Sequence, residues 1–260
     1  RVAARAASSA AFDVRTVVRG QEGTESFRLA YETAAGASLS PWHDLPLAAG
    51  VGAGADDALF TFVNEIPRGA RAKMEIATKE EWNPIKQDVK KGKLRDYHSD
   101  SLVNYGALPQ TWEDPQHADK ETGLQGDDDP VDVCELGAAP APLGSVYAVR
   151  VIGALAMVDE GEMDWKLLAV RVDDPDWGSV TDIASPSAPA ALVARVDELR
   201  TWFRDYKLPD GKPQNEFAYD GRALPRDFAE NVIAETHGLW KALRVAGAGK
   251  SKLWVPKGSA

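Results

Sequence analysis

The chain has 260 residues, of which 44% are hydrophobic and 27% are charged, a composition typical of a globular protein. Its net charge of −10 argues against nucleic acid as the main partner, because a phosphate backbone is bound by a cationic surface. No apolar run approaches the ~18 residues of a membrane span, so no membrane partner is expected. Cys134 is the only cysteine, which excludes an internal disulfide.

The N-terminal segment, residues 1–13, differs in composition from the rest of the chain. It begins RVAARAASSAAF, is rich in Ala, Arg and Ser, and has its first acidic residue at Asp13. Such a composition is typical of the end of an organellar transit peptide. We therefore predict a disordered remnant of a targeting region over 1–13 and a single domain over 14–260.

Hydrophobic periodicity predicts strands followed by helices. Strands are expected at 14–19, 27–33, 58–66 and 71–78, and again at 131–136, 145–158 and 165–172. The Pro/Gly-rich segment 40–57 should form a surface loop, and the basic segment 83–95 an exposed turn or hairpin. Two helices, 190–205 and 226–243, would each bury one apolar face, made of Leu192, Val196, Leu199 and Phe203 and of Phe228, Val232, Leu239 and Leu243. This order favours an α+β, mainly β fold around one barrel or sheet.

The stretch GDDDPVDVCE, residues 126–135, carries four aspartates: Asp127, Asp128, Asp129 and Asp132. Two like charges about 4 Å apart repel by about 1–4 kcal/mol, depending on the local dielectric. Such crowding is relieved either by water, as in a solvated loop, or by a bound cation. In a strand, Asp127 and Asp129 would share a face, and the interruption at Pro130 would allow Asp132 to turn toward the same side.

A second acidic group, VDEGEMDWK at 158–166, lies between two predicted strands. If these strands form a hairpin, a four-residue connection places Asp159 opposite Asp164, with Lys166 on the same face as Asp164. The group is either a polar hairpin tip or a cation site that also handles an anion. Carboxylates suit Mg²⁺. The EF-hand spacing fails because Asp132 stands where that loop needs Gly, and four scattered histidines make zinc improbable.

Cationic and hydroxyl side chains are spread over several other blocks. Lys73 shares a predicted strand face with Glu75, Glu65 lies on the preceding strand, and Arg95 ends the basic stretch. Each is an ordinary surface group when taken alone. The cations among them, Lys73 and Arg95, could clamp a phosphate together with Tyr105, Tyr206 and Lys207. The stretch GAGKS at 247–251 is not a nucleotide-binding loop, because Arg244 stands where that motif needs Gly.

Seven blocks in this order resemble the family I soluble inorganic pyrophosphatases of eukaryotic type: SPWHDLPL, EIPRGARAKMEI, NPIKQDVKKGKLR, NYGALPQTWEDP, GDDDPVDVCE, DEGEMDWK and WFRDYKLPDGKPQNEF. The resemblance covers roughly residues 25–243. It implies a single domain with a five-stranded OB-like β-barrel and peripheral helices. It also implies hydrolysis of pyrophosphate to two phosphates, with several Mg²⁺ ions per active site and in-line attack by a metal-bridged water or hydroxide.

The resemblance also implies a role for individual residues. Asp127, Asp132 and Asp164 resemble ligands of the tightest metal sites, Asp159 resembles a ligand of a metal that arrives with substrate, and Glu75 resembles an acid close to the metals. Asp129 resembles the carboxylate that deprotonates the attacking water, and Glu65 a nearby network acid. The substrate-binding residues would be Lys73, Arg95, Tyr105, Lys166, Tyr206 and Lys207, of which Lys73, Arg95 and Tyr105 would also take part in catalysis.

Two positions depart from the family pattern. Relatives carry a tyrosine, often treated as a proton donor, where this chain has Ser101, and the segment before Tyr105 is several residues shorter here; Tyr97 is the alternative, at a different spacing. Gly69 replaces an aromatic residue that fungal and animal relatives use in a dimer contact. We therefore expect a monomer.

Two other functions remain open at this point. One is a broader two-metal phosphoesterase, and the other is an inactive OB-type binding module, for which Ser101 is the only motivation. For a pyrophosphatase, removal of pyrophosphate would pull forward biosynthesis of the kind that makes nucleotide sugars for starch. The expected compartment is thus the chloroplast stroma, with the mitochondrion or cytoplasm as alternatives.

Overall fold

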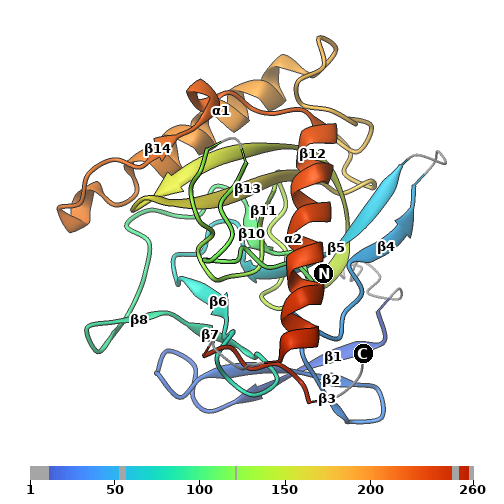
Figure 1. Ribbon diagram of the computed structural model, residues 1–260, viewed down its shortest axis with the longest axis vertical. Helices are drawn as coiled ribbons and strands as arrows, with labels where there is room; N and C mark the ends of the chain where they lie inside the picture. The colour runs from blue at the N-terminus through green and yellow to red at the C-terminus, as the bar shows by residue number, and fades with distance from the viewer. Residues whose placement is uncertain (1–11, 53–56, 121, 248–251, 258–260) are drawn as a thin grey trace, which may run out of the picture.

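Five strands form a barrel-like ring at the centre of this computed structural model, which describes residues 12–52, 57–120, 122–247 and 252–257 (Figure 1). Each strand pairs with the next around the ring, and the last pairs back with the first. The β11–β13 pair is parallel and the others are antiparallel. In ring order the strands are β5 (Ala58–Ile66), β10 (Asn104–Ala107), β11 (Asp132–Glu135), β13 (Glu162–Val170) and β12 (Val146–Asp159). The short strands β4 (Ala48–Val51) and β14 (Glu216–Phe217) extend this sheet.

A second, smaller sheet lies beside the barrel at the lower end of the view in Figure 1. Its strand order is β1-β2-β7-β6, with β3 paired to β2. Its strands are β1 (Val14–Arg19), β2 (Arg28–Thr33), β7 (Ile85–Gln87), β6 (Met74–Ile76) and β3 (Ser38–Leu39). A separate hairpin of β8 (Val89–Lys90) and β9 (Lys93–Leu94) follows this sheet in the chain.

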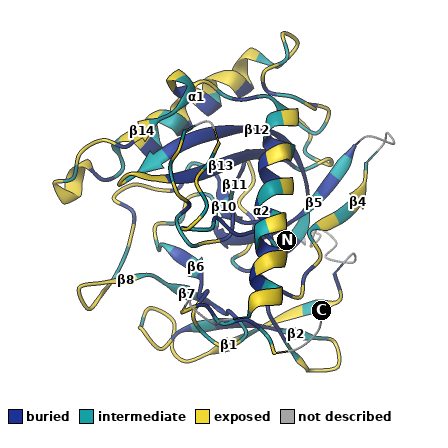
Figure 2. Ribbon diagram, viewed as in Figure 1, coloured by how far each residue is buried: buried dark blue, intermediate teal, exposed yellow. Residues whose placement is uncertain are grey.

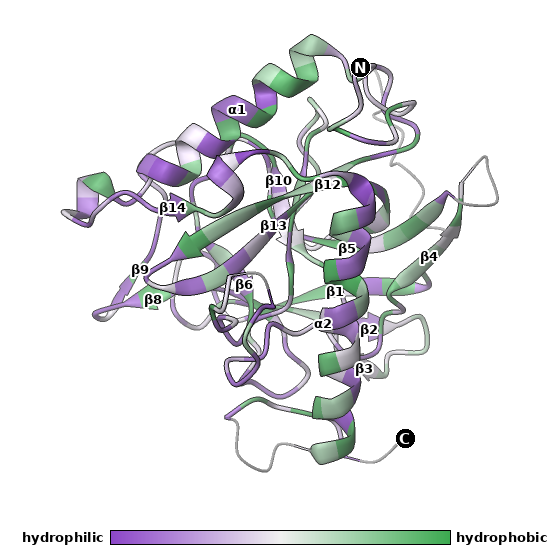
Figure 3. Ribbon diagram, turned by 45° about the horizontal axis from the view of Figure 1, so that its top comes forward, coloured by the Kyte–Doolittle hydropathy of each residue, from purple (hydrophilic) through white to green (hydrophobic). Residues whose placement is uncertain are grey.

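Two helices cover the barrel from outside, α1 (Ala190–Asp205) and α2 (Arg226–Ala246), each preceded by a proline at its N-cap. Helix α1 buries the apolar face expected from its sequence, Leu192, Val196, Leu199 and Phe203. Helix α2 buries Val232 and Leu243 of its predicted face. It spans both sheets, because its first half packs against the barrel and its second half against the core of the smaller sheet. The outward face of α2 stays exposed (Figure 2), and polar and apolar residues alternate around both helices (Figure 3). The described residues also form two short 3₁₀ helices, η1 (Leu208–Asp210) and η2 (Tyr219–Gly221).

The prediction of an α+β, mainly β single domain with a five-stranded barrel and peripheral helices is confirmed. Both helices and the predicted strands exist, although 71–78 contributes only the three residues of β6. Segment 40–57 is not wholly a loop, because it includes β4. The hairpin register also differs from the prediction. The connection is Glu160–Gly161, both with positive φ (52° and 93°), so Asp159 faces Glu162 and Asp164 faces Met157. A two-residue turn of this type matches the twist of paired strands.

A buried histidine joins three distant parts of the chain. The imidazole of His43 stacks on Trp42, with ring centroids 4.3 Å apart. The indole N–H of Trp240 on α2 donates to Nδ1 at 2.9 Å, and Nε2 lies 3.0 Å from the carbonyl oxygen of Trp254. Because an indole nitrogen can only donate, Nδ1 must be the acceptor and Nε2 carries the hydrogen. Burial lowers the pKa of His43 to about 4, which keeps the ring neutral.

The ends of the chain bear on two of the sequence predictions. Residues 1–11 of the expected targeting remnant lie outside the described residues, whereas Phe12 packs into the core of the smaller sheet with 8% of its surface exposed. Residues 248–251 of the GAGKS stretch also lie outside the described residues. Among the helices that the structure describes, none combines the length and apolar character needed to cross a membrane.

Candidate active site

A cavity of about 360 Å³ opens between the barrel, the smaller sheet and the C-terminal end of α1. Its lining is unusual because it combines many carboxylates with many cations. All thirteen residues that the sequence analysis assigned to the site line it: Glu65, Lys73, Glu75, Arg95, Tyr105, Asp127, Asp129, Asp132, Asp159, Asp164, Lys166, Tyr206 and Lys207. The structure therefore brings together residues that are up to 142 positions apart in sequence.

The floor of the cavity is set by strand register. Asp132 is the first residue of β11 and lies beside Lys166 of the parallel strand β13. The ammonium of Lys166, 2% exposed, donates to Asp132 Oδ2 at 2.5 Å, to Asp164, and to the hydroxyl oxygen of Tyr105 at 3.0 Å. Tyr105 in turn donates to Asp132. Desolvation opposes the charge on Lys166, but its two carboxylate partners outweigh burial and raise its pKa.

The turn before β11 carries two more cavity aspartates. Asp127 and Asp129 both line the cavity, and the Asp129 backbone N–H donates to Asp127 Oδ1 at 3.1 Å. Asp128 has φ = 74° and accepts a hydrogen bond from the Trp112 indole at 3.1 Å, so it does not line the cavity. A strand over this stretch, as predicted for the shared face of Asp127 and Asp129, would also have turned Asp128 away from them. The separation is real, but its cause is a left-handed residue in a turn.

Glu113 was given no role from the sequence, but its carboxylate lies close to those of Asp127 and Asp164. Oxygens of Glu113, Asp127 and Asp164 lie within 4.8 Å of one another. One oxygen of Glu113 accepts the Trp165 backbone N–H at 3.1 Å, and the other is buried without a hydrogen-bond partner. Burial, and then repulsion from Asp127 and Asp164, raise the pKa of Glu113 well above its usual value. A lone glutamate in a polar loop carries no pattern that could have identified it beforehand.

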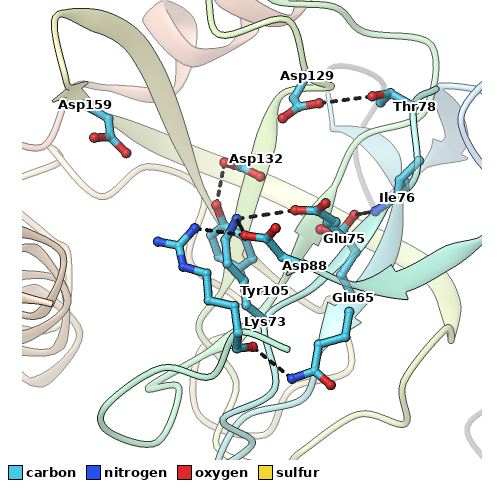
Figure 4. Close-up of polar contacts among 12 residues, drawn as sticks. Glu65, Lys73, Glu75, Ile76, Thr78, Asp88, Tyr105, Asp129, Asp132 and Asp159 are labelled. Atoms are coloured by element: carbon cyan, nitrogen blue, oxygen red, sulfur yellow. Dashed lines mark hydrogen bonds and ion pairs between the residues drawn. The ribbon is translucent and has the colours of Figure 1, made fainter. Parts of the chain in front are cut away.

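Cations occupy the wall formed by the smaller sheet and the β8–β9 hairpin (Figure 4). Backbone hydrogen bonds fix this wall, from Lys73 N–H to Arg95 O at 3.0 Å and from Arg95 N–H to Asp88 O at 2.8 Å. The Asp88 carboxylate lies 2.9 Å from Arg95 Nη1 and 3.5 Å from Lys73 Nζ. Asp88 was not assigned to the site from sequence, and it keeps these two cations side by side.

Another part of the cavity wall comes from α1 and the β12–β13 turn. Tyr206 is the C-cap of α1 and Lys207 follows it, so both are delivered where the helix ends. Lys207 forms an ion pair with Asp159, and its ammonium lies 3.3 Å from Glu160. The Tyr206 hydroxyl lies 3.5 Å from Asp159. Asp159 and Asp164 thus do not face each other across the hairpin as predicted, but both line the same cavity.

Acids on the remaining wall have perturbed ionisation. Glu65, 5% exposed, accepts the Ile76 backbone N–H at 2.6 Å, and burial raises its pKa well above the usual value. Desolvation, and then repulsion from Glu75, raise the pKa of Asp129 to about 7, although Lys73 acts in the opposite direction. A carboxylate with a pKa near neutrality can accept a proton at physiological pH and release it again.

Such a cavity defines a class of site. Clustered carboxylates favour hard divalent cations, and an array of Lys, Arg and Tyr favours a small polyanion.

The family model for inorganic pyrophosphatase matches residues 62–241. The mouse inorganic pyrophosphatase is 49% identical over 227 residues, which cover 85% of this chain and 75% of the mouse protein. The Arabidopsis thaliana soluble inorganic pyrophosphatase 6, chloroplastic, is 44% identical over 253 residues, or 95% of this chain and 81% of that protein.

Solved structures agree with this result. A truncated vacuolar soluble pyrophosphatase of Trypanosoma cruzi, in complex with PPi, has a TM-score of 0.83 and 40% identity, and the match covers 89% of this chain and 91% of that one. The type I inorganic pyrophosphatase of Toxoplasma gondii has a TM-score of 0.80 and 43% identity, covering 88% and 99%. The chain therefore belongs to the inorganic pyrophosphatase family. It is an inorganic diphosphatase, an enzyme that hydrolyses inorganic pyrophosphate.

Proposed function

We propose that this enzyme is a Mg²⁺-dependent pyrophosphatase, and that the predicted residues carry the roles given above. The observation that supports this most directly is the single cavity that contains both the aspartate group around Asp132 and the cationic group around Lys73. Neither group alone suits the reaction. Pyrophosphate is highly anionic and repels an oxygen nucleophile, so its hydrolysis needs cations that neutralise it and a base that activates water.

The donor set fits magnesium. Carboxylate oxygens of Asp127, Asp164 and Glu113 lie within 4.8 Å of one another, and a buried oxygen of Glu113 lacks a hydrogen-bond partner. An unpartnered buried carboxylate is costly unless a cation or proton is close. We assign Asp127, Asp132 and Asp164 as principal ligands, with Asp159 and Glu75 nearer to the substrate. Magnesium bound there would lower the pKa of a water molecule and offset the charge of pyrophosphate.

The chain's own groups then orient the substrate and move protons. Asp129, with its pKa near 7, accepts the proton of the attacking water at a carboxylate oxygen. Water oxygen forms a bond to one phosphorus while the bond between that phosphorus and the bridging oxygen breaks, and the bridging oxygen leaves with the second phosphate. Lys166, Tyr206 and Lys207 hold one side of the pyrophosphate, and the Lys73–Arg95 wall holds the other. Glu65 fixes the strand that bears Glu75 through its bond to Ile76.

The direct test is release of phosphate from pyrophosphate with and without Mg²⁺. We expect Asp132→Asn to lower kcat/KM by at least about 100-fold, because it removes a charge used in the transition state. The matched control is Asp128→Asn, which makes the same chemical change four residues away. Asparagine tolerates the positive φ of residue 128 and can still accept the Trp112 hydrogen bond. Equal activity of both variants would contradict the proposed ligand set, as would phosphate release that is independent of Mg²⁺.

Two finer points belong to the same proposal. A broader phosphoesterase would hydrolyse p-nitrophenyl phosphate at a rate comparable to pyrophosphate, whereas we expect pyrophosphate to be strongly preferred. We also propose the chloroplast stroma as the compartment, supported by the chloroplastic relatives from Arabidopsis thaliana and Chlamydomonas reinhardtii. Fractionation of the source cells followed by immunodetection tests this, and recovery of the protein only outside plastids would contradict it.

A further inference from the structure

Tyr97 lies in the shortened segment between β9 and β10, and its ring is held rigidly on the cavity wall. The ring is buried, with 8% of the residue exposed, and contacts Trp202 and Tyr206 edge-on at centroid distances of 5.0 and 5.9 Å. Trp202 itself stacks on Tyr206 with an interplanar angle of 11°. The Tyr97 backbone N–H donates to Arg71 O at 2.7 Å. Backbone and ring are therefore both fixed, and Tyr97 lines the same cavity as the assigned residues.

The hydroxyl of Tyr97 forms no hydrogen bond to another residue in the described part of the chain. Most of the charged groups that act on its ionisation are cations of the site, Lys73, Lys166 and Arg95; the carboxylate of Asp132 acts in the opposite direction. Burial nevertheless raises the pKa of Tyr97 to about 12, so the hydroxyl keeps its hydrogen at neutral pH. The hydroxyl oxygen is not among the fully buried, unpartnered side-chain atoms of the described residues, and Tyr97 lines the cavity. This donor is therefore available to whatever anion those cations hold.

Ser101 cannot make the same contact. It is 4% exposed, its Oγ donates to Val103 O at 2.8 Å, and it does not line the cavity. Its backbone N–H is also committed, to Ala70 O at 2.9 Å. Within the described segment from Arg95 to Tyr105, Tyr97 is thus the residue that presents a neutral donor to the cavity without an internal partner.

We propose that the Tyr97 hydroxyl donates a hydrogen bond to a phosphoryl oxygen of bound pyrophosphate, on the wall formed by Lys73 and Arg95. The proposal rests on the function assigned above and adds a substrate contact to it. The donor is neutral, so it binds the phosphoryl oxygen without adding to the repulsion among the cations of that wall. The contact involves no proton transfer: Tyr97 keeps its hydrogen throughout.

The experiment removes the hydroxyl and keeps the ring. Hydrogen bonds to charged groups contribute enough that Tyr97→Phe should lower kcat/KM for pyrophosphate by roughly 10- to 100-fold. The matched control is Tyr147→Phe, which deletes a hydroxyl bonded to Glu135 at 3.3 Å, outside the cavity. We expect that control to stay within about twofold of the parent. A loss below about threefold in Tyr97→Phe, or an equal loss in both variants, would overturn the proposal.

A second readout does not depend on turnover. Methylenediphosphonate has a carbon bridge and cannot be hydrolysed, yet it carries the same phosphoryl oxygens. In Mg²⁺, its stabilising shift of Tm should be smaller for Tyr97→Phe than for the parent, while the shift caused by Mg²⁺ alone should be equal in both. A weakened response to Mg²⁺ alone would instead place Tyr97 among the metal-holding residues and refute the contact. Failure of the proposed function is distinct, because the parent protein itself would then release no phosphate.

Discussion

Protonation of His43 should destabilise the fold by an amount that can be worked out from its surroundings. In the neutral ring, Nδ1 accepts from Trp240 and Nε2 donates to Trp254, so a second proton would face the Trp240 N–H and break that bond. Burial, and then the positive charge of Arg244, lower the pKa of His43 from 6.5 to about 4. One pKa unit corresponds to about 1.4 kcal/mol, so the full effect is about 3 kcal/mol.

The direction in which pH changes the free energy of unfolding depends on whether the folded or the unfolded chain binds the proton at the higher pH. As the pH falls below 6.5, the unfolded chain takes up a proton at residue 43 while the folded chain does not, so the free energy of unfolding decreases. The decrease continues until the pH reaches about 4, where the folded ring also protonates. The neutral ring of His43 thus makes its full contribution to the free energy of unfolding above pH 6.5. At pH 4.5 we expect about 2.5 kcal/mol of it to be lost.

The measurement compares the parent with His43→Asn, which cannot titrate and whose amide oxygen can still accept from Trp240. Urea unfolding of both proteins at pH 7 and pH 4.5 gives four free energies of unfolding. The carboxylates of the cavity titrate in the same range, but they do so equally in both proteins and cancel in the difference. If the parent loses no more stability than His43→Asn between these two pH values, the assigned tautomer and its burial are wrong.

Two other outcomes follow from the site and the surface. Lys207→Met removes the cation that pairs with Asp159, so KM for pyrophosphate should rise at least about tenfold while the Tm shift caused by Mg²⁺ is largely retained; an unchanged KM would remove Lys207 from the substrate clamp. Gly69 is exposed and has no side chain, so this position offers no aromatic anchor to a second copy. We expect light scattering to give the mass of a monomer, and a stable dimer at micromolar concentration would contradict this.

Much of the fold could be predicted because local pattern and final structure agree. The bounds of β5 and α1 match the predicted ranges, since each is an uninterrupted apolar or amphipathic run with a proline at one end. Strand β10 could not be predicted in this way. Its sequence, Asn-Tyr-Gly-Ala, has low strand propensity, and it becomes a strand because β5 and β11 pair with it on both sides. Gly106 is required there, since a Cβ would lie 1.9 Å from Val63 O.

The site residues fall into two groups, those that could be assigned from sequence and those that could not. Residues in recognisable blocks, such as Asp132 and Lys166, were assigned from sequence, and the structure places them on the cavity lining. Glu113 and Asp88 were not assigned, because only their neighbours make them important. Glu113 lies close to two aspartates that line the cavity, and Asp88 lies between Lys73 and Arg95. The predicted register of the β12–β13 hairpin was wrong for a similar reason, because the sequence pattern does not determine the length of the turn. The turn at Glu160 is two residues long, and no hydrophobic pattern distinguishes two from four.

The end of helix α1 has a consequence for redesign. The aspartates assigned to the metals lie on or next to barrel strands, whereas Tyr206 and Lys207 sit where a peripheral helix stops and η1 begins. Two of the proposed substrate-binding residues, Tyr206 and Lys207, therefore belong to a short exterior segment that is contiguous in sequence and separate from the strands that carry the aspartates. Grafting a different 206–216 segment onto the same barrel is the economical route to a phosphohydrolase of altered selectivity.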